Sequence, residues 1–161
     1  MELHVIAVGK IRDPAVRDAC DMYAKRLRRR QRLHVVEVKE AGRRAATPQD
    51  ARRFEAASLL RAMPERARGV ALTRDGAPLT SRQLAEHLAS WRLVARDVAF
   101  LIGGAHGLAL DLIGRCELTL SLSALTLPHE MARLVLLEQL YRAETILRGE
   151  PYHKGEASAR R

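Results

Sequence analysis

Residues Phe100–Glu130 read FLIGGAHGLALDLIGRCELTLSLSALTLPHE, and the rest of the chain is organised around this stretch. Three glycines, Gly103, Gly104 and Gly107, follow an apolar run, so the backbone there can turn sharply and approach a ligand closely. A small, apolar, hydroxyl-rich segment comes next, ends in Pro128-His129 and leads into a long helical pattern. The stretch therefore predicts a ligand-binding edge of an α/β sheet.

Length and composition indicate a globular domain without a membrane segment. The chain has 161 residues, of which 47% are hydrophobic and 29% charged. No apolar run approaches the roughly 20 residues that span a bilayer, and the N-terminus lacks the basic and apolar regions of a signal peptide. Cys20 and Cys116 make neither a disulfide framework nor a metal-ligand spacing. We expect a cytoplasmic protein with reduced thiols.

The net charge of +9 favours a polyanionic partner such as nucleic acid. Its densest part, 25–32, carries six basic residues in eight positions. These cations suit the C-terminal end of a helix, where they are either solvated or bound to phosphates. Coding composition is a second explanation for the charge, because arginine far outnumbers lysine and alanine is abundant.

Alternating strand and helix patterns predict the fold class. Short apolar runs predict strands at 3–8, 33–38, 69–73, 97–102 and 117–120. Asp13-Pro14, Thr47-Pro48 and Thr80 or Ser81 are typical helix starts. The helices are expected at 14–28, from 48, from 81, at 110–115 and at 129–147. This order implies an α/β fold, with a mostly parallel sheet and helices on both faces.

Side-chain patterns add expectations within this fold. Residues 75–78, Asp-Gly-Ala-Pro, should form a turn after the third strand. Trp91 shares a leucine stripe and should lie in the core rather than serve as a base-stacking platform. The helix from 48 should turn one apolar face inward. That face comprises Phe54, Ala57, Leu60 and Ala62.

The last helix, 129–147, carries apolar residues around most of its circumference. A helix with one side on the surface does not need them, so it is either central in the fold or packed on a second subunit. We favour a homodimer with isologous geometry. The apolar positions are Leu134, Val135, Leu136, Leu137, Leu140 and Tyr141.

Ligands of an open parallel sheet bind beyond the carboxyl ends of the strands. Leu72 and Thr73 in the third strand, Gly103 and Gly104 after the fourth, and the segment 122–127 should therefore line one crevice. Such walls suit an uncharged adenine ring better than a triphosphate. Neither a P-loop nor a dinucleotide fingerprint is present. The segment comprises Leu122, Ser123, Ala124, Leu125, Thr126 and Leu127.

No nucleophilic triad and no metal site follow from the pattern. His106, His129 and His153 are too dispersed to be called metal ligands. His129 stands at a helix start, where it is either a helix cap or a functional imidazole. Glu138 and Arg142 lie four residues apart on the last helix, and the simplest interpretation is a surface ion pair.

Four motifs, LIGGAHGL, SLSALTLPH, LLEQLYRA and PYHK in this order, together resemble the ribosomal RNA large subunit methyltransferase H family. Its members are small proteins of the SPOUT class, and the resemblance covers essentially the full length. It implies methyl transfer from S-adenosyl-L-methionine to N3 of a pseudouridine in large-subunit (23S) ribosomal RNA, as free RNA or in an assembled ribosome. It also implies a C-terminal trefoil knot and a homodimer whose active site is completed by the other subunit.

The resemblance assigns the cofactor positions to Leu72, Gly103 and 122–127, in agreement with the crevice. It also sets the limits of the domain. One SPOUT domain is expected over 1–154, and 155–161 extend past the usual end of the family as a mobile basic extension.

The implied reaction suggests roles for four residues. Loss of the N3 proton places negative charge on the flanking carbonyl oxygens, so a cation or donor there lowers the barrier. Arg142 is our candidate for the cation that stabilises this negative charge. Tyr152 could stack on the base or hydrogen-bond to it. His129 or His153 could remove the proton or orient the base. The proton could instead leave to water, and no metal is required.

Two alternatives remain open. The first is a non-catalytic RNA- or ribosome-binding protein on the same fold, and the intact motifs argue against it. The second is a nucleotide-binding α/β protein with a phosphate on the glycine turn. The absence of a lysine or arginine beside Gly103 and Gly104 argues against that function.

Overall fold

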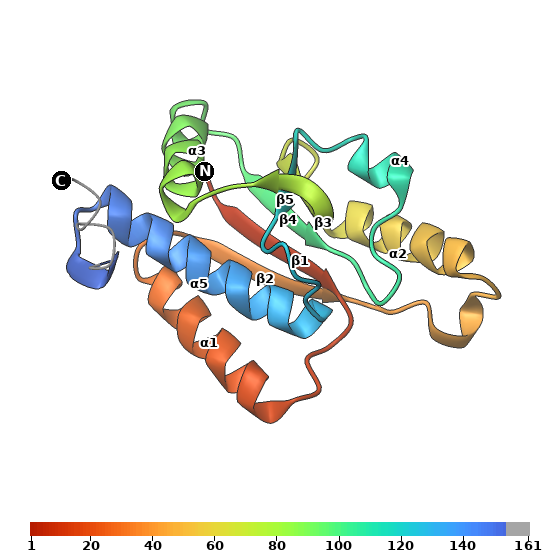
Figure 1. Cartoon of the computed structure of the whole chain (residues 1–161). Helices are drawn as coiled ribbons and strands as arrows, with labels where there is room; N and C mark the ends of the chain where they lie inside the picture. The colour runs from red at the N-terminus through yellow and green to blue at the C-terminus, as the bar shows by residue number, and fades with distance from the viewer. Residues whose placement is uncertain (154–161) are drawn as a thin grey trace.

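A five-stranded parallel sheet forms the centre of the protein, in the order β2-β1-β4-β3-β5 (Figure 1). The computed structural model describes residues 1–153, so the extension expected at 155–161 lies outside the described residues. The strands are β1 (Leu3–Val8), β2 (Leu33–Val38), β3 (Arg68–Pro78), β4 (Val98–Ile102) and β5 (Leu118–Ser121).

Helices cover both faces of the sheet, as the sequence predicts. One face carries α1 (Pro14–Arg28), α3 (Ser81–Leu93) and α5 (His129–Leu147). The other face carries α2 (Pro48–Ala62) and α4 (Leu110–Ile113). Two short 3₁₀ helices, η1 (Gly42–Arg44) and η2 (Pro151–His153), lie between β2 and α2 and after α5. No helix in the described part of the chain is long and apolar enough to cross a membrane.

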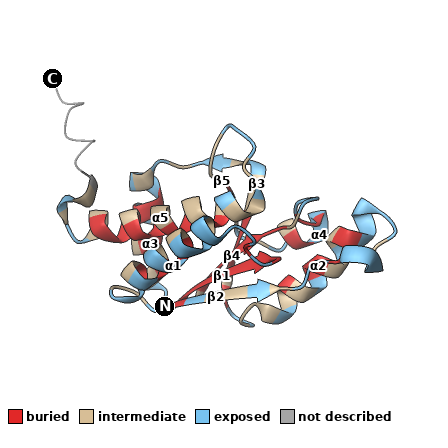
Figure 2. Cartoon of the chain, turned by 90° about the horizontal axis from the view of Figure 1, so that it is seen from below, coloured by how far each residue is buried: buried red, intermediate tan, exposed pale blue. Residues whose placement is uncertain are grey.

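The central strands β1 and β4 are buried on both sides (Figure 2). Leu3 and Val5 of β1 pack in the cluster beneath α1, α3 and α5, together with Trp91, whose predicted core position is confirmed. Ile6 and Val8 of β1 pack in the cluster beneath α2 and α4. Continuous apolar strands are therefore required, because neither face of these strands meets water.

The predicted helix starts are confirmed by their hydrogen bonds. The Asp13 side chain accepts a bond of 2.8 Å from the Ala15 N–H, one of the donors that the first turn of α1 leaves unpaired. Thr47 accepts from the Asp50 N–H at 3.1 Å in α2. Thr80 begins α3 with a capping box. Polar residues at these points thus fix where each helix begins.

The prediction for the inward face of α2 is wrong. The face that is buried in the structure is rotated about the helix axis relative to the predicted one. Ala57 is exposed, whereas Glu55 is buried because its carboxylate accepts a hydrogen bond of 3.2 Å from the Ala41 N–H. An apolar pattern cannot detect a carboxylate that is buried to satisfy a backbone donor. Phe54, Leu60 and Ala62 are half-buried, and the buried residues are Ala51, Glu55, Ala56 and Leu59.

The predicted turn at 75–78 is also wrong, since β3 continues to Pro78. Its register against β5 shifts between Leu72 and Ala77, which both stand opposite Leu120. The residues between them form a bulge that brings Gly76 against the β5 backbone. A Cβ atom on Gly76 would lie 2.6 Å from the carbonyl carbon of Leu120, so this position requires glycine.

We expect Gly76→Ala to destabilise the protein by about 2 kcal/mol or more, because the β5 backbone cannot move away without losing its pairing. Gly114→Ala is the matched control. Gly114 has a φ of −63° and its added Cβ atom would meet no atom closer than 3.5 Å. Its free energy of unfolding should change by less than about 0.5 kcal/mol. Urea denaturation measures both, and equal stability of the two variants would contradict the requirement for glycine at Gly76.

Candidate active site

Three strand ends meet at the carboxyl edge of the sheet. Ala71 of β3 pairs with Leu101 of β4, and Leu72 of β3 pairs with Leu120 of β5. The parallel register therefore brings Leu72, Gly103 and Leu122 to the same edge. The crevice predicted from the sequence thus has its three segments side by side, although they come from distant parts of the chain.

The glycine turn after β4 is confirmed, but its first two glycines face the protein itself. A Cβ atom on Gly103 would lie 2.6 Å from the carbonyl carbon of Gly107, and one on Gly104 would lie 2.9 Å from the Glu55 carboxylate. Gly107 has a φ of 75°, which favours glycine. Gly107 also donates its N–H to the Gly104 carbonyl at 3.0 Å. The lack of a side chain at Gly103 and Gly104 therefore allows the turn itself to pack closely against the protein.

The segment 122–127 is irregular, and the side chains at its centre, 124–126, are exposed. The Ser123 hydroxyl accepts a hydrogen bond of 2.9 Å from the Leu125 N–H, and the Ser121 hydroxyl donates to the Ser123 carbonyl at 3.0 Å. These bonds hold the turn, and 77% of the Leu125 surface is exposed. Ala124 and Thr126 are exposed as well, whereas Leu122, Ser123 and Leu127 are half-buried.

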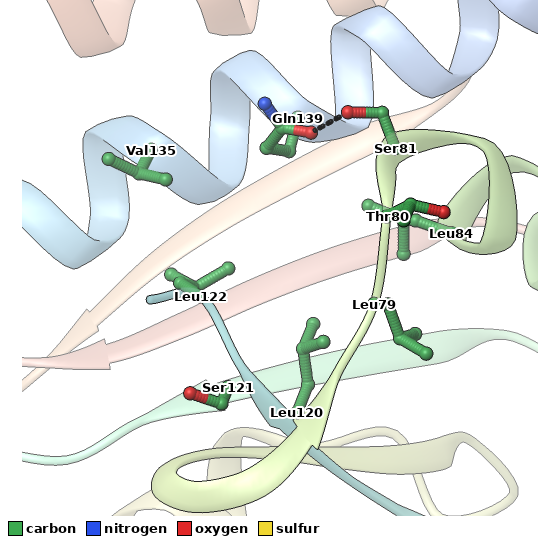
Figure 3. A pocket seen from close by; sticks show the side chains of 9 residues that line it. All are labelled: Leu79, Thr80, Ser81, Leu84, Leu120, Ser121, Leu122, Val135 and Gln139. Atoms are coloured by element: carbon green, nitrogen blue, oxygen red, sulfur yellow. Dashed lines mark hydrogen bonds between the residues drawn. The ribbon is translucent and has the colours of Figure 1, made fainter. Parts of the chain in front are cut away.

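A pocket of about 380 Å³ opens beside this segment (Figure 3). Leu122 is the one residue that it shares with the predicted cofactor positions. The Ser81 hydroxyl donates a 2.6 Å hydrogen bond to Gln139 of α5 across its rim. The walls are aliphatic side chains and uncharged polar groups, from Leu79, Thr80, Ser81, Leu84, Leu120, Ser121, Leu122, Val135 and Gln139.

His129 is the first residue of α5 and is half-buried. The helix begins without a side-chain cap, so the interpretation of His129 as a helix cap is wrong. The next residue, Glu130, anchors this end of α5 by accepting hydrogen bonds from the Arg12 and Asp13 N–H groups. The bond from Arg12 is the main cause that lowers the pKa of Glu130.

A second group of functional candidates lies at the other end of α5. Arg142 donates to Glu138 at 2.6 Å, and its guanidinium carbon lies 5.0 Å from the centre of the Tyr152 ring. Tyr152 donates to the same Glu138 oxygen at 3.2 Å. The side chains of Arg142 and Glu138 are only 32% and 17% exposed, so the expected surface ion pair is instead half-buried.

Two further tyrosines, which were not predicted as site residues, complete this cluster. The Tyr23 and Tyr152 hydroxyl oxygens lie 3.3 Å apart, and the Tyr141 ring meets that of Tyr152 edge-on at 4.8 Å. Tyr23 is 129 residues away along the chain, and nothing in its own stretch of sequence signals the contact. We call Tyr23, Glu138, Tyr141, Arg142 and Tyr152 the arginine–tyrosine cluster.

The cluster sets the protonation of its members. Burial, together with the hydrogen bond to Tyr23 and the nearby Glu138 carboxylate, raises the pKa of Tyr152 well above its ordinary value. The hydrogen bond to Glu138 raises the pKa of Arg142. Tyr152 is therefore a neutral donor and Arg142 a fixed cation.

Most of the basic run at 25–32 is engaged within the protein. Arg30 pairs with Glu150 at 2.5 Å and Arg32 with Glu2 at 2.9 Å. Arg28 donates to the Leu33 carbonyl at 3.3 Å, and the Arg26 guanidinium lies 5.9 Å from the Tyr141 ring centre. These contacts favour a structural role for the run over a phosphate-binding one.

The structure does not bring all predicted catalytic residues together within one chain. His129 and Arg142 are 13 positions apart on α5, a separation of about 20 Å at 1.5 Å per residue. Tyr152 lies at the Arg142 end, and the predicted cofactor segment lies at the His129 end. His153 belongs to η2 at the Arg142 end, and its side chain lies outside the described part.

One possible metal-binding group occurs in the described part of the chain. Glu2, His4 and His34 place ligand atoms within 4.8 Å of one another at the amino-terminal edge of the sheet, opposite the site. Glu2 already bonds to Arg32 at 2.9 Å and to His34 at 2.7 Å. The group is therefore separate from the residues considered above.

Comparison with known proteins identifies relatives along nearly the whole chain. A ribosomal RNA large subunit methyltransferase H from Anaeromyxobacter sp. (strain Fw109-5) is 51% identical, covering 96% of this chain and all of the relative. The protein of the same name from Paraburkholderia xenovorans (strain LB400) is 45% identical, covering 96% and 99%.

Comparison with solved structures finds a similar overall fold. The structure of a probable methylase family protein from Haemophilus influenzae Rd KW20 superimposes with a TM-score of 0.58 at 11% identity, covering 93% of this chain and 69% of the other. The family described as predicted SPOUT methyltransferase matches residues 1–153. The chain therefore belongs to the SPOUT methyltransferase family.

Proposed function

We propose that this protein is an S-adenosyl-L-methionine-dependent methyltransferase that methylates N3 of a pseudouridine in large-subunit ribosomal RNA. The observation that carries the proposal is the full-length match to relatives named ribosomal RNA large subunit methyltransferase H. A non-catalytic RNA-binding protein is the weaker alternative, because it would not need the cofactor edge and the arginine–tyrosine cluster intact.

The carboxyl edge of the sheet fits the adenosine part of the cofactor. Leu72, Gly103 and the segment 122–127 offer apolar side chains and backbone groups without a charge, which suits a flat, uncharged ring. S-adenosyl-L-methionine, when bound, supplies the methyl group from its sulfonium. We also propose the trefoil knot of the SPOUT class. The tight backbone contact of Gly76 with β5 supports a close approach of two distant chain segments there.

The arginine–tyrosine cluster fits the RNA side of the reaction. Arg142 would stabilise the negative charge that develops on the base carbonyl oxygens when N3 loses its proton. Tyr152 would orient the base by hydrogen bonding or stacking and, as a neutral phenol, would not act as the base that takes the proton. His129 or His153 would accept that proton or orient the base, unless it passes directly to water.

A homodimer would bring the two halves of the site together. Within one chain about 20 Å separates His129 from Arg142, too far for both to touch one base. An isologous pair that places the Arg142 end of one α5 beside the His129 end of its partner would complete two sites. The exposed Met131 near the His129 end offers apolar surface for that contact.

The remaining parts of the proposal concern the domain and its location. We propose one SPOUT domain over 1–154 and a cytoplasmic location. Both cysteines, Cys20 and Cys116, are free thiols, which suits a reducing compartment.

The reaction predicts a mass difference in ribosomal RNA. Large-subunit RNA from cells that lack this protein should have lost one methyl group at a pseudouridine, and the purified protein should restore it with S-adenosyl-L-methionine. Mass spectrometry of the digested RNA measures both. Calorimetry should give about one cofactor site per subunit. Binding without methyl transfer would favour the non-catalytic alternative.

The shared site predicts that two inactive variants complement each other. Leu125→Asp alters the cofactor side and Arg142→Ala the RNA side. Half of the dimers formed from an equal mixture are mixed, and each has one intact site, so about one quarter of the wild-type activity should return. The mixture must be co-expressed so that the subunits exchange. The double variant Leu125→Asp/Arg142→Ala, mixed with wild type, is the control for subunit exchange. No recovery in the first mixture would mean that each chain carries its own complete site.

The neutral state of Tyr152 predicts the effect of replacing it. Tyr152→Phe should lower kcat at least tenfold while cofactor affinity stays unchanged, because the ring remains and only the donor is lost. Since the pKa of Tyr152 is raised, its proton stays bound up to its ordinary pKa of about 10, so wild-type activity should show no loss from its ionisation below that pH. Loss of cofactor affinity in Tyr152→Phe would instead place the residue on the cofactor side.

A further inference from the structure

A groove between the end of β2 and the outer face of α2 is not used by the proposed reaction. It encloses about 510 Å³. Helix α2 contacts β1 and β2 on the face opposite α1 and α5 (Figure 1). The lining residues are Val38, Lys39, Arg44, Phe54, Ser58, Arg61 and Ala62, and we call this the α2 groove.

The α2 groove is positively charged and has no acidic residue in its lining. Lys39, Arg44 and Arg61 are exposed, and none of them has a carboxylate partner among residues 1–153. Several arginines elsewhere in residues 1–153 are, by contrast, paired with carboxylates. Arginines with such partners are Arg12, Arg30, Arg32, Arg68, Arg92, Arg96, Arg133 and Arg142. The unpaired charge in the α2 groove is therefore available to an anion.

An aromatic ring lies within this charged lining. The Arg44 guanidinium carbon stands 5.5 Å from the centre of the Phe54 ring, as in a cation–π contact. Phe54 is only half-buried, because the rotation of α2 that buries Glu55 places Phe54 at the border of the core. Aromatic rings and guanidinium planes are the surfaces on which proteins stack unpaired RNA bases.

We propose that the α2 groove docks a single-stranded segment of the RNA substrate, with phosphates on Lys39 and Arg61 and a base stacked on the Arg44–Phe54 pair. The inference rests on the proposed function for the identity of the RNA, and its own evidence is the charge and the ring. It commits to RNA over an acidic protein segment because a peptide carboxylate would use the cations but not the ring.

The position of the groove suits RNA that reaches the cofactor edge. Val38 ends β2 at the carboxyl edge of the sheet, the edge that also holds Leu72 and Gly103. Three strand spacings separate β2 from β3, about 14 Å at 4.8 Å each. One RNA strand could therefore cross from the groove to the site along a single side of the protein.

The groove offers few groups that could read a base. The Ser58 hydroxyl already donates to the Phe54 carbonyl at 3.2 Å, and the remaining polar groups are cations. Binding there should be insensitive to sequence, as expected where phosphates and stacking dominate. The choice of the target nucleotide would then lie at the reacting site.

The test compares two charge-matched double variants. Lys39→Ala/Arg61→Ala removes the proposed phosphate contacts, and Arg66→Ala/Arg115→Ala removes two exposed arginines that have no ion-pair partner among the described residues. Fluorescence anisotropy with a labelled oligouridine should give about tenfold weaker binding for the first variant at 0.1 M salt. Its logarithmic salt slope should fall by about 1.4, or 0.7 per lost single-strand contact. The second variant should match wild type. Equal behaviour of the two would overturn the proposal.

Substitutions of Phe54 distinguish the contribution of base stacking to RNA binding from that of charge. Phe54→Leu should weaken oligouridine binding about fivefold or more without changing the salt slope, and Phe54→Tyr should retain wild-type affinity. A thermal melt of each variant checks that the fold is intact. Unchanged binding by Phe54→Leu would overturn the stacking part.

A methylation assay on large-subunit particles distinguishes failure of the groove proposal from failure of the proposed methyl transfer. Lys39→Ala/Arg61→Ala should raise KM and leave kcat and cofactor affinity unchanged, because the groove touches no reacting atom. If wild type binds oligouridine through the groove but transfers no methyl group, the proposed reaction fails and the RNA site stands. An unchanged KM with normal methylation would overturn the groove as a substrate contact.

Discussion

The parallel register of β3, β4 and β5 is the constraint on which the rest of the site depends. It places Leu72, Gly103 and Leu122 at one edge, and a shift by one residue would turn every side chain of the shifted strand to the opposite face. Glycine makes this register possible, because the bulge of β3 brings Gly76 against the β5 backbone with no room for a Cβ atom. The proposed cofactor edge and the packing of the sheet are thus consequences of the same backbone contacts.

Local rules predicted most of the fold from the sequence, and long-range contacts account for what was missed. Asp13 and Thr47 begin helices where the sequence predicts them, because capping uses neighbouring backbone donors. Glu55 and Gly76 contradicted the predictions because their reasons lie in distant segments, namely the Ala41 N–H and the β5 backbone. Of the candidate site, the common edge of the three strand ends followed from parallel topology alone, whereas the contact of Tyr23 with Tyr152 has no local pattern.

Helix α5 determines how the candidate residues can cooperate. Its 19 residues hold His129 near the proposed cofactor segment and Arg142 near Tyr152, and a helix of this length cannot bend enough to bring them together. The half-buried ion pair of Arg142 with Glu138 also restrains the cation before RNA arrives. A fixed, partly neutralised arginine loses little conformational freedom on binding, which favours stabilisation of charge that appears only during the reaction. In the proposed reaction such a residue would contribute more to the chemical step than to RNA affinity.

Affinity for RNA must then come from cations that the fold has not already paired. The net charge of +9 overstates what is available, because the densest basic run largely binds Glu2, Glu150, a carbonyl group and tyrosine rings within the protein. An exposed cation without a partner gives up only its hydration when it meets a phosphate, whereas a paired arginine must also release its carboxylate. The distribution of carboxylates, more than that of arginines, therefore determines where the surface can hold RNA. Lys39, Arg44 and Arg61 of the α2 groove meet this criterion, and they lie beside an aromatic ring on which a base can stack.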